Sequence, residues 1–173
     1  MLILGIDPGT RETGICGYDS SIGRPLANHL FSPGVAFCGL FGNDGVISIL
    51  ANWHSHFDAI VIERPTLYGK GGEALVETVI WAGRFFQAAG FAARFMTRGE
   101  VCEHWSVNGL GKGKDAIINQ KLVDRYGGID GKKKAVGTKA APGPLFGVTG
   151  HSRQALALAI AYAETKITKG EEF

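Results

Sequence analysis

The sequence lacks the segments that would place a protein in or across a membrane. No apolar run in its 173 residues approaches the ~20 residues that a membrane-spanning helix needs. The N-terminal residues also lack the basic stretch and apolar core of a signal peptide. We therefore expect a protein of the cytoplasm.

Cysteine is scarce. Cys16, Cys38 and Cys102 are odd in number, far apart and in no spacing typical of a metal site. We expect three reduced thiols, as is usual for an intracellular protein.

A strong net charge is absent as well. The formal net charge is +2, so the charge of the whole chain says little about its partners. Basic residues are nevertheless concentrated in one segment, which would suit a polyanion. A solvated loop explains that segment at least as well. Its cations are Lys112, Lys114, Lys121, Arg125, Lys132, Lys133, Lys134 and Lys139.

What the sequence does contain is sufficient for one globular domain over residues 1–173. Hydrophobic residues make up 45% of the chain, enough for an apolar core, and the 26 glycines indicate many loops. The glycine-rich segment Gly109–Lys114 has no Ser or Thr after its final lysine. It therefore does not fit a nucleotide-binding Walker loop.

The chain opens with an apolar segment, Leu2–Ile6, that leads directly into Asp7 and then into Pro8-Gly9. Burying an unpaired carboxylate is costly, so this strand end needs an explanation. A hydrogen-bonded structural aspartate at an ordinary turn is one explanation, and a ligand for a divalent metal is the other. Residues Thr13–Tyr18 then form the second strand of a hairpin.

The same pattern occurs again at residues 58–65. The β-branched, apolar run Ala59–Ile62 ends in Glu63, and Pro65 stops the strand just beyond it. A helix followed by such a strand predicts a parallel crossover onto the first sheet. Asp7 and Glu63 would then lie on neighbouring strand ends, within reach of a shared metal ion.

The remaining pattern predicts an α/β protein. A third strand, interrupted by Pro33-Gly34, is expected over His29–Phe37, and a helix is expected over Asn43–Phe57. A helix over Glu73–Ala89 is expected to bury Leu75, Val76, Val79, Ile80, Gly83 and Phe86. We also expect a strand over Phe91–Met96, helices over Arg98–Trp105, Asp115–Tyr126 and Thr149–Lys169, and a mobile loop over residues 127–147.

His151 and Gln154 are three residues apart at the start of the last predicted helix, so they share one face of its first turn. Taken alone, a histidine there is ordinarily a cap or an exposed surface residue.

Several of these motifs together resemble the RuvC family of Holliday junction resolvases, and most closely the RuvC-like proteins of bacteria and their phages. The resemblance covers most of the chain, including Gly111–Lys114 and the helix after it. It is carried by Gly5-Ile6-Asp7-Pro8-Gly9-Thr10 with Thr13-Gly14, by Ile62-Glu63, and by His151 ahead of Ala155-Leu156-Ala157-Leu158-Ala159.

The resemblance implies a ribonuclease H-like fold with a mixed five-stranded sheet flanked by helices. It implies a homodimer that cuts opposite strands of a four-way DNA junction in a bacterial or phage-infected cell. It also implies two Mg²⁺ or Mn²⁺ ions, one lowering the pKa of the attacking water and one stabilising the leaving oxygen. By this resemblance Asp7 and Glu63 are metal ligands, and His151 is a ligand or general base.

Gln154 departs from the family pattern, which has an aspartate at this position. A carboxamide oxygen can coordinate a metal but brings no charge. Three explanations stay open: a natural variant with fewer metal ligands, an acid recruited from elsewhere in the chain, or a DNA-binding protein that does not cleave.

Contacts with DNA are expected near the same site. Tyr68 would act as an aromatic wedge or stack on an unpaired base, although a partly exposed loop aromatic explains it equally well. The residues expected to neutralise phosphates are Arg11, Arg64, Lys70, Lys112 and Lys114.

An ATP-binding protein of the actin-like superfamily is a further alternative, because its first strand also ends in Asp-x-Gly before a hairpin. The chain is too short for the second lobe that holds the nucleotide in such proteins.

Overall fold

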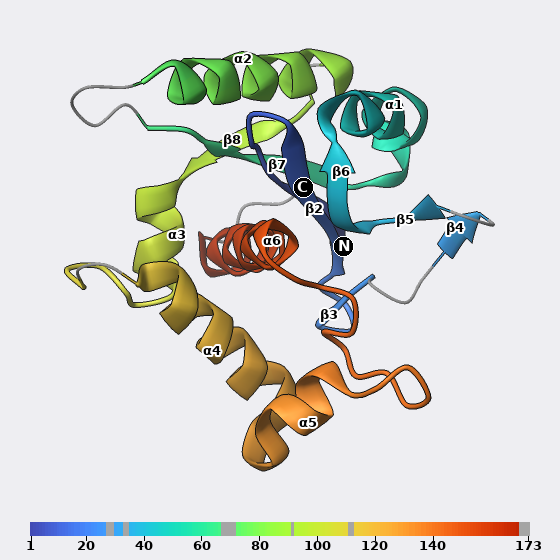
Figure 1. Cartoon of the computed structure of the whole chain (residues 1–173), viewed down its shortest axis with the longest axis vertical. Helices are drawn as coiled ribbons and strands as arrows, with labels where there is room; N and C mark the ends of the chain where they lie inside the picture. The colour runs from blue at the N-terminus through green and yellow to red at the C-terminus, as the bar shows by residue number, and fades with distance from the viewer. Residues whose placement is uncertain (27–29, 33–34, 67–71, 91, 111–112, 170–173) are drawn as a thin grey trace.

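A mixed β-sheet runs through the middle of the molecule, and helices cover both of its faces (Figure 1). The structure is a computed structural model that describes residues 1–26, 30–32, 35–66, 72–90, 92–110 and 113–169. No helix within these ranges is both long and apolar enough to span a membrane.

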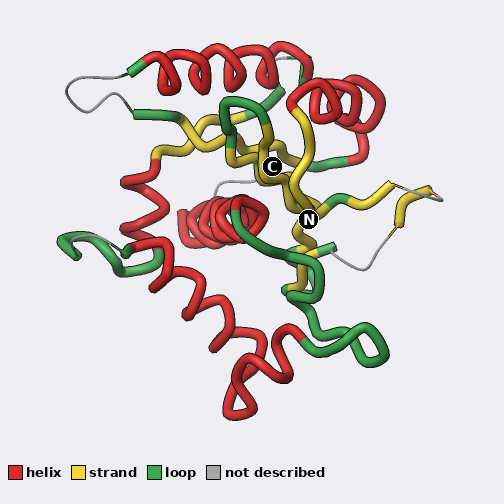
Figure 2. Tube along the Cα trace, in the orientation of Figure 1, coloured by secondary structure: helices red, strands yellow, loops and turns green. Residues whose placement is uncertain are grey.

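Strands β1 to β6 come first in the described chain, strands and helices alternate from β6 to α3, and the chain ends in helices (Figure 2). The strands are β1 (Leu2–Asp7), β2 (Glu12–Asp19), β3 (Arg24–Pro25), β4 (Leu30–Ser32), β5 (Val35–Ala36), β6 (Cys38–Gly42), β7 (Ala59–Arg64) and β8 (Arg94–Thr97). The α-helices are α1 (Asn43–Trp53), α2 (Glu73–Ala88), α3 (Arg98–His104), α4 (Lys114–Gly127), α5 (Gly131–Val136) and α6 (His151–Lys169), and short 3₁₀ helices cover His54–His56 and Gly128–Asp130.

The main sheet has the predicted mixed topology. Its long strands follow the order β6-β2-β1-β7-β8, with the two-residue strand β3 also paired to β2. Strands β1, β2 and β6 pair antiparallel, and β1, β7 and β8 pair parallel. The hairpin at the N-terminus and the parallel crossover to β7 are therefore both confirmed.

Side chains alternate between two hydrophobic cores along β1. Ile3 packs in the core that contains the buried residues of α3, α4, α5 and α6, whereas Leu4 and Ile6 pack with α1 and α2. This alternation is the period of two that a strand buried on both faces imposes. Helix α6 lies against the sheet through an alanine-rich segment, and its residues 155–161 are completely buried.

The predicted third strand, His29–Phe37, is wrong in its extent. The described part of this region forms the separate two-stranded sheet β4-β5, and the strand that pairs with β2 is β6, farther along the chain. The predicted interruption at Pro33-Gly34 falls between β4 and β5 in the sequence, and those two residues lie outside the described ones.

The predicted buried face of the helix at Glu73–Ala89 is correct only in part. Phe86 is half-buried against the core, as predicted. Val76, Val79 and Ile80 are exposed, and the fully buried residues of the helix are Ala82 and Phe85. Helical periodicity identifies the stripe with the bulkiest apolar side chains. Helix α2 instead packs against α1 and β7 through the neighbouring face that contains the small residue Ala82.

Two of the three cysteines are not the free thiols that were predicted. Cys16 and Cys38 form a disulfide, and only Cys102 is a free, buried thiol among the described residues. The pairing follows from the sheet register, because Cys16 of β2 lies directly opposite Cys38 of β6. A third strand that ends at Phe37 leaves Cys38 outside the predicted sheet, so the sequence pattern did not predict this pairing.

Residues 127–147 are more structured than the single loop that was predicted. They contain a 3₁₀ turn and helix α5, and Ala135 and Leu145 are fully buried. The N–H of Leu145 donates to the carbonyl oxygen of Ala135 at 2.8 Å, so the chain folds back on itself. The many glycines and lysines of this segment predict a loop, although Ala135 and Leu145 are buried.

Candidate active site

Two carboxylates lie at the same edge of the sheet. Strands β1 and β7 are parallel neighbours with Ile6 paired to Ile62, so Asp7 and Glu63 are the next residues on each strand. Their side chains are only 14% and 16% exposed, respectively. The carboxyl ends of parallel strands are a common place for ligand sites in α/β folds, and the predicted juxtaposition of the two acids is confirmed.

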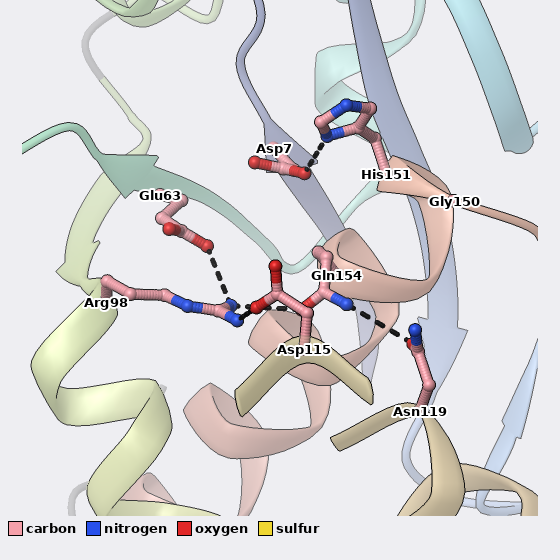
Figure 3. A pocket seen from close by; sticks show the side chains of 8 residues that line it. All are labelled: Asp7, Glu63, Arg98, Asp115, Asn119, Gly150, His151 and Gln154. Atoms are coloured by element: carbon pink, nitrogen blue, oxygen red, sulfur yellow. Dashed lines mark hydrogen bonds and ion pairs between the residues drawn. The ribbon is translucent and has the colours of Figure 1, made fainter. Parts of the chain in front are cut away.

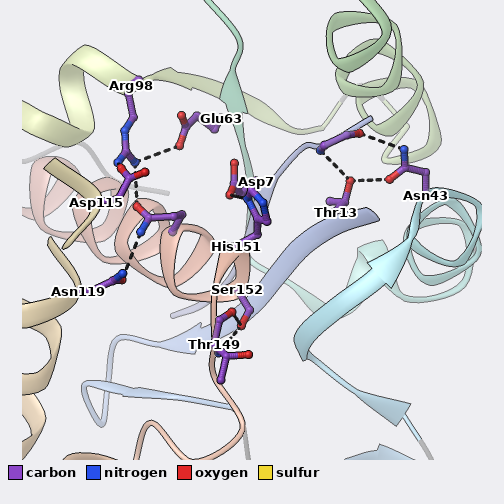
Figure 4. Close-up of polar contacts among 12 residues, drawn as sticks. Asp7, Thr13, Asn43, Glu63, Arg98, Asp115, Asn119, Thr149, His151 and Ser152 are labelled. Carbon is purple, nitrogen blue, oxygen red and sulfur yellow. Dashed lines mark hydrogen bonds and ion pairs between the residues drawn. The ribbon is translucent and has the colours of Figure 1, made fainter. Parts of the chain in front are cut away.

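The turn after Asp7 is fixed by a buried polar network (Figure 4). The Thr13 hydroxyl donates to Asn43 Oδ1 at 2.7 Å. The Asn43 amide donates to the carbonyl oxygens of Gly9 and Thr10 at 3.1 and 3.2 Å. Both side chains are almost fully buried, so this network connects the turn to the start of α1 and holds the end of β1 in place.

Two glycines let the first turn of α6 approach these carboxylates. A Cβ at Gly5 would overlap the carbonyl oxygen of Ala155, and one at Gly14 would overlap the backbone of His151. Because neither glycine has a side chain, α6 lies close to β1 and β2. His151 thereby reaches Asp7.

His151 and Asp7 form a direct contact (Figure 3). Nδ1 of His151 lies 2.7 Å from Oδ2 of Asp7, and since a carboxylate only accepts, the imidazole nitrogen is the donor. This hydrogen bond raises the pKa of His151, against the opposing effect of partial burial. The ring is otherwise exposed toward solvent, at 61%.

Glu63 is in an unfavourable position for a charged group. Burial, followed by the charge of Asp7, raises the pKa of Glu63 to about 7, although Arg98 opposes the rise. Its Oε2 atom is buried and accepts no hydrogen bond from the part of the chain that the structure describes. A cation bound between the two acids would therefore stabilise their ionised forms.

Arg98 forms an ion pair with Glu63. Its Nη1 lies 3.5 Å from Glu63 Oε2 and donates to Gln154 Oε1 at 3.0 Å. Its Nη2 forms an ion pair with Asp115. The Gln154 amide in turn donates to Asn119 Oδ1 at 3.2 Å, so both ends of the Gln154 side chain are hydrogen-bonded.

These residues surround one cavity of about 360 Å³ (Figure 3). Sequence reasoning identified four of its lining residues and missed three polar ones, Arg98, Asp115 and Asn119. Arg98 had a usable signal, since it follows directly on the end of β8 and thus reaches the same sheet edge as Glu63. Asp115 and Asn119 reach the cavity only because α4 packs beside α6. The full lining is Asp7, Glu63, Arg98, Asp115, Asn119, Gly150, His151 and Gln154.

Among the described residues that were predicted to contact DNA, Arg11, Arg64 and Lys114 do not line this cavity. Arg11 is exposed in the turn after β1, Arg64 is exposed at the end of β7, and Lys114 is partly buried at the start of α4. The other three predicted contacts, Tyr68, Lys70 and Lys112, lie outside the described residues.

The sheet order and the helices on both faces form a ribonuclease H-like α/β fold, which is the fold class predicted from sequence. The structure is similar in fold to Thermus thermophilus RuvC. One such structure, RuvC in complex with a Holliday junction substrate, has a TM-score of 0.59 and 18% identity, covering 98% of this chain and 96% of that one. A second T. thermophilus RuvC structure has a TM-score of 0.56 and 20% identity, covering 98% and 97%.

The similarity is one of structure rather than sequence. No protein-family model and no curated protein sequence matches the chain.

Asp7 and Glu63 are the residues of the site that could hold a divalent cation. Both supply hard oxygen ligands, although the buried Oε2 of Glu63 already lies 3.5 Å from Arg98 Nη1. Across the described ranges no three acidic, histidine or cysteine side chains lie close enough to hold an ion by themselves. Gln154 is hydrogen-bonded at both ends, and the third carboxylate of the cavity, Asp115, pairs with Arg98.

Proposed function

We propose that this protein is a divalent-metal-dependent endonuclease that resolves Holliday junctions or other branched DNA by paired nicking in the cytoplasm of a bacterial or phage-infected cell. The observation that carries the proposal is the convergence of Asp7, Glu63 and His151 at one sheet edge of a RuvC-type fold. In one similar structure, RuvC is in complex with a Holliday junction substrate.

The reaction is hydrolysis of a DNA phosphodiester. Asp7 and Glu63 would hold Mg²⁺ or Mn²⁺, which makes bound water a better nucleophile at neutral pH. The water oxygen forms a bond to phosphorus while the bond from phosphorus to the leaving ester oxygen breaks. One proton passes from the water to a base, and the leaving oxygen takes a proton from solvent.

His151 is suited to be that base. Its Nδ1 donates to Asp7, so in the neutral ring Nε2 carries the lone pair that accepts a proton. The hydrogen bond to Asp7 orients the ring and stabilises the imidazolium that results.

Two copies of the chain would be needed to cut opposite strands of a junction. Val76, Val79 and Ile80, which are 52%, 40% and 56% exposed, form an apolar stripe on α2 that suits a second copy. Light scattering should give a dimer for the wild type and a monomer for Ile80→Glu. Ile22→Glu, at an equally exposed isoleucine in a turn, should remain a dimer.

DNA phosphates would be neutralised by Arg11, Arg64, Lys70, Lys112 and Lys114, with Tyr68 near the crossover. Replacing one of these cations should weaken junction binding and make it less sensitive to salt, because one fewer counterion is released. Tyr68→Ala with unchanged junction binding and cleavage would remove Tyr68 from this proposal.

The test of function is cleavage of a labelled four-way junction, beside linear duplex, with Mg²⁺ and with Mn²⁺. Paired nicks near the crossover that disappear in Asp7→Asn would support the proposal. Cleavage of linear duplex at the same rate would contradict junction selectivity.

A non-cleaving protein that binds branched DNA is the second candidate. It is favoured by the neutral Gln154, which brings no charge to a metal site, and by the ion pair between Arg98 and Glu63, which competes with a metal for that carboxylate. Junction binding without cleavage in either metal would establish it.

A further inference from the structure

Arg98 puts a fixed positive charge inside the candidate active site. Its guanidinium is within 3.5 Å of Glu63 and 3.0 Å of Gln154, and it lines the same cavity as Asp7 and His151. The side chain is only 25% exposed, and its ion pair with Asp115 on α4 fixes the orientation of the planar group. Arg98 is therefore held in the site by contacts with Glu63, Gln154 and Asp115.

The surroundings of Gln154 explain why an amide replaces an acid. Its oxygen accepts from Arg98, and its nitrogen donates to Asn119. A carboxylate could accept from Arg98 but could not donate to the Asn119 oxygen. Arg98 already pairs with the carboxylates of Glu63 and Asp115, so the amide at 154 avoids a third acid around this one guanidinium.

We infer that the site holds one divalent ion and that Arg98 replaces the second one; this inference rests on the proposed function. The ion lies at Asp7 and Glu63, and Arg98 contacts the scissile phosphate. As the bond to the leaving ester oxygen breaks, the electron pair stays on that oxygen, and the N–H groups of Arg98 donate to it. A guanidinium has five such donors in a rigid plane, and it needs no metal ligand to stay in place.

The charges of the site agree with this assignment. An acid at position 154 would add a fourth carboxylate to those of Asp7, Glu63 and Asp115, which line the same cavity, and would call for further positive charge. The chain instead combines a neutral residue at 154 with a positive one at 98. Arg98 follows β8, the parallel neighbour of β7, so the sheet itself delivers the cation next to Glu63.

The first test counts bound ions, independently of cleavage. Titration of the full-length protein with Mn²⁺, followed by electron paramagnetic resonance and calorimetry, should give one ion per chain. The double variant Arg98→Ala/Gln154→Asp removes the built-in cation and supplies the missing acid, so it should bind two. Gln154→Asp alone should still bind one, because Arg98 pairs with the new carboxylate. The same count in the wild type and the double variant, or no ion in the wild type, overturns the inference.

The second test measures cleavage and binding separately. Arg98→Ala should lower junction cleavage about 100- to 1,000-fold, the usual effect of removing one donor at a developing charge, with junction affinity changed less than about threefold. Arg94→Ala is the matched control, since Arg94 is an exposed arginine of β8 that is not among the residues lining this cavity, and it should cleave like the wild type. Wild-type cleavage by Arg98→Ala overturns the inference. A wild type that binds one Mn²⁺ but cuts no junction contradicts the proposed function and leaves the ion count standing.

Discussion

Ionised Glu63 is predicted to lower the free energy of unfolding of the protein at neutral and higher pH. The pKa of Glu63 is raised from 4.5 to about 7, chiefly by burial and then by Asp7. A carboxyl whose pKa is higher in the folded chain favours folding in its protonated form. Its contribution is thus fully present below pH 4.5 and is lost as pH rises through 7.

The size of this effect follows from the shift. A rise from 4.5 to about 7 corresponds to roughly 3 kcal/mol. Glu63→Gln mimics the protonated acid at every pH, so it should be more stable than the wild type by this amount at pH 8. That difference corresponds to a melting temperature about 6–12 °C higher for a chain of this size. At pH 4 the two proteins should melt together.

The assay is thermal unfolding in a metal chelator from pH 4 to pH 8. Glu103→Gln is the control, because Glu103 is exposed on α3 and its replacement should change stability by less than about 0.5 kcal/mol. Equal melting of Glu63→Gln and the wild type at pH 8 would refute the reasoning.

Cleavage should show the opposite dependence on pH. An ionised Glu63 is needed to hold a cation, so the affinity for the metal, and with it cleavage at subsaturating metal, should rise as pH increases through about 7. Glu63→Gln should gain stability and lose cleavage. Wild-type cleavage by Glu63→Gln at every pH would contradict a need for the charge of Glu63.

Two further predictions concern the packing that positions the site. Gly5→Ala should cost about 3 kcal/mol or more, because the new Cβ would overlap the carbonyl oxygen of Ala155; Gly45→Ala in α1, which meets open space, should cost nothing, and equal melting of the two variants would contradict the role of Gly5. Asn43→Ala should cost roughly 2–3 kcal/mol in chemical unfolding, because it leaves the buried Thr13 hydroxyl without its acceptor; a loss below about 0.5 kcal/mol would show that the network is not needed.

Local sequence patterns determined much of the fold. The hairpin at β1 and β2, the parallel strand β7 and the position of α6 were all predicted, because each depends on a strong local signal. An apolar run that ends in an acid and a turn residue specifies both a strand and its end. The juxtaposition of Asp7 and Glu63 followed from these signals, since parallel neighbours end at the same sheet edge.

Only the tertiary structure decided the rest. The face that α2 buries, the disulfide between Cys16 and Cys38, and the arrival of Arg98 and Asp115 beside Glu63 each depend on elements far apart in the chain. Periodicity reports which residues share a face, but not what that face meets. The proximity of Asp7 and Glu63 could therefore be predicted from the sequence. The position of Arg98 depends on packing, because only the folded sheet brings the end of β8 beside the end of β7.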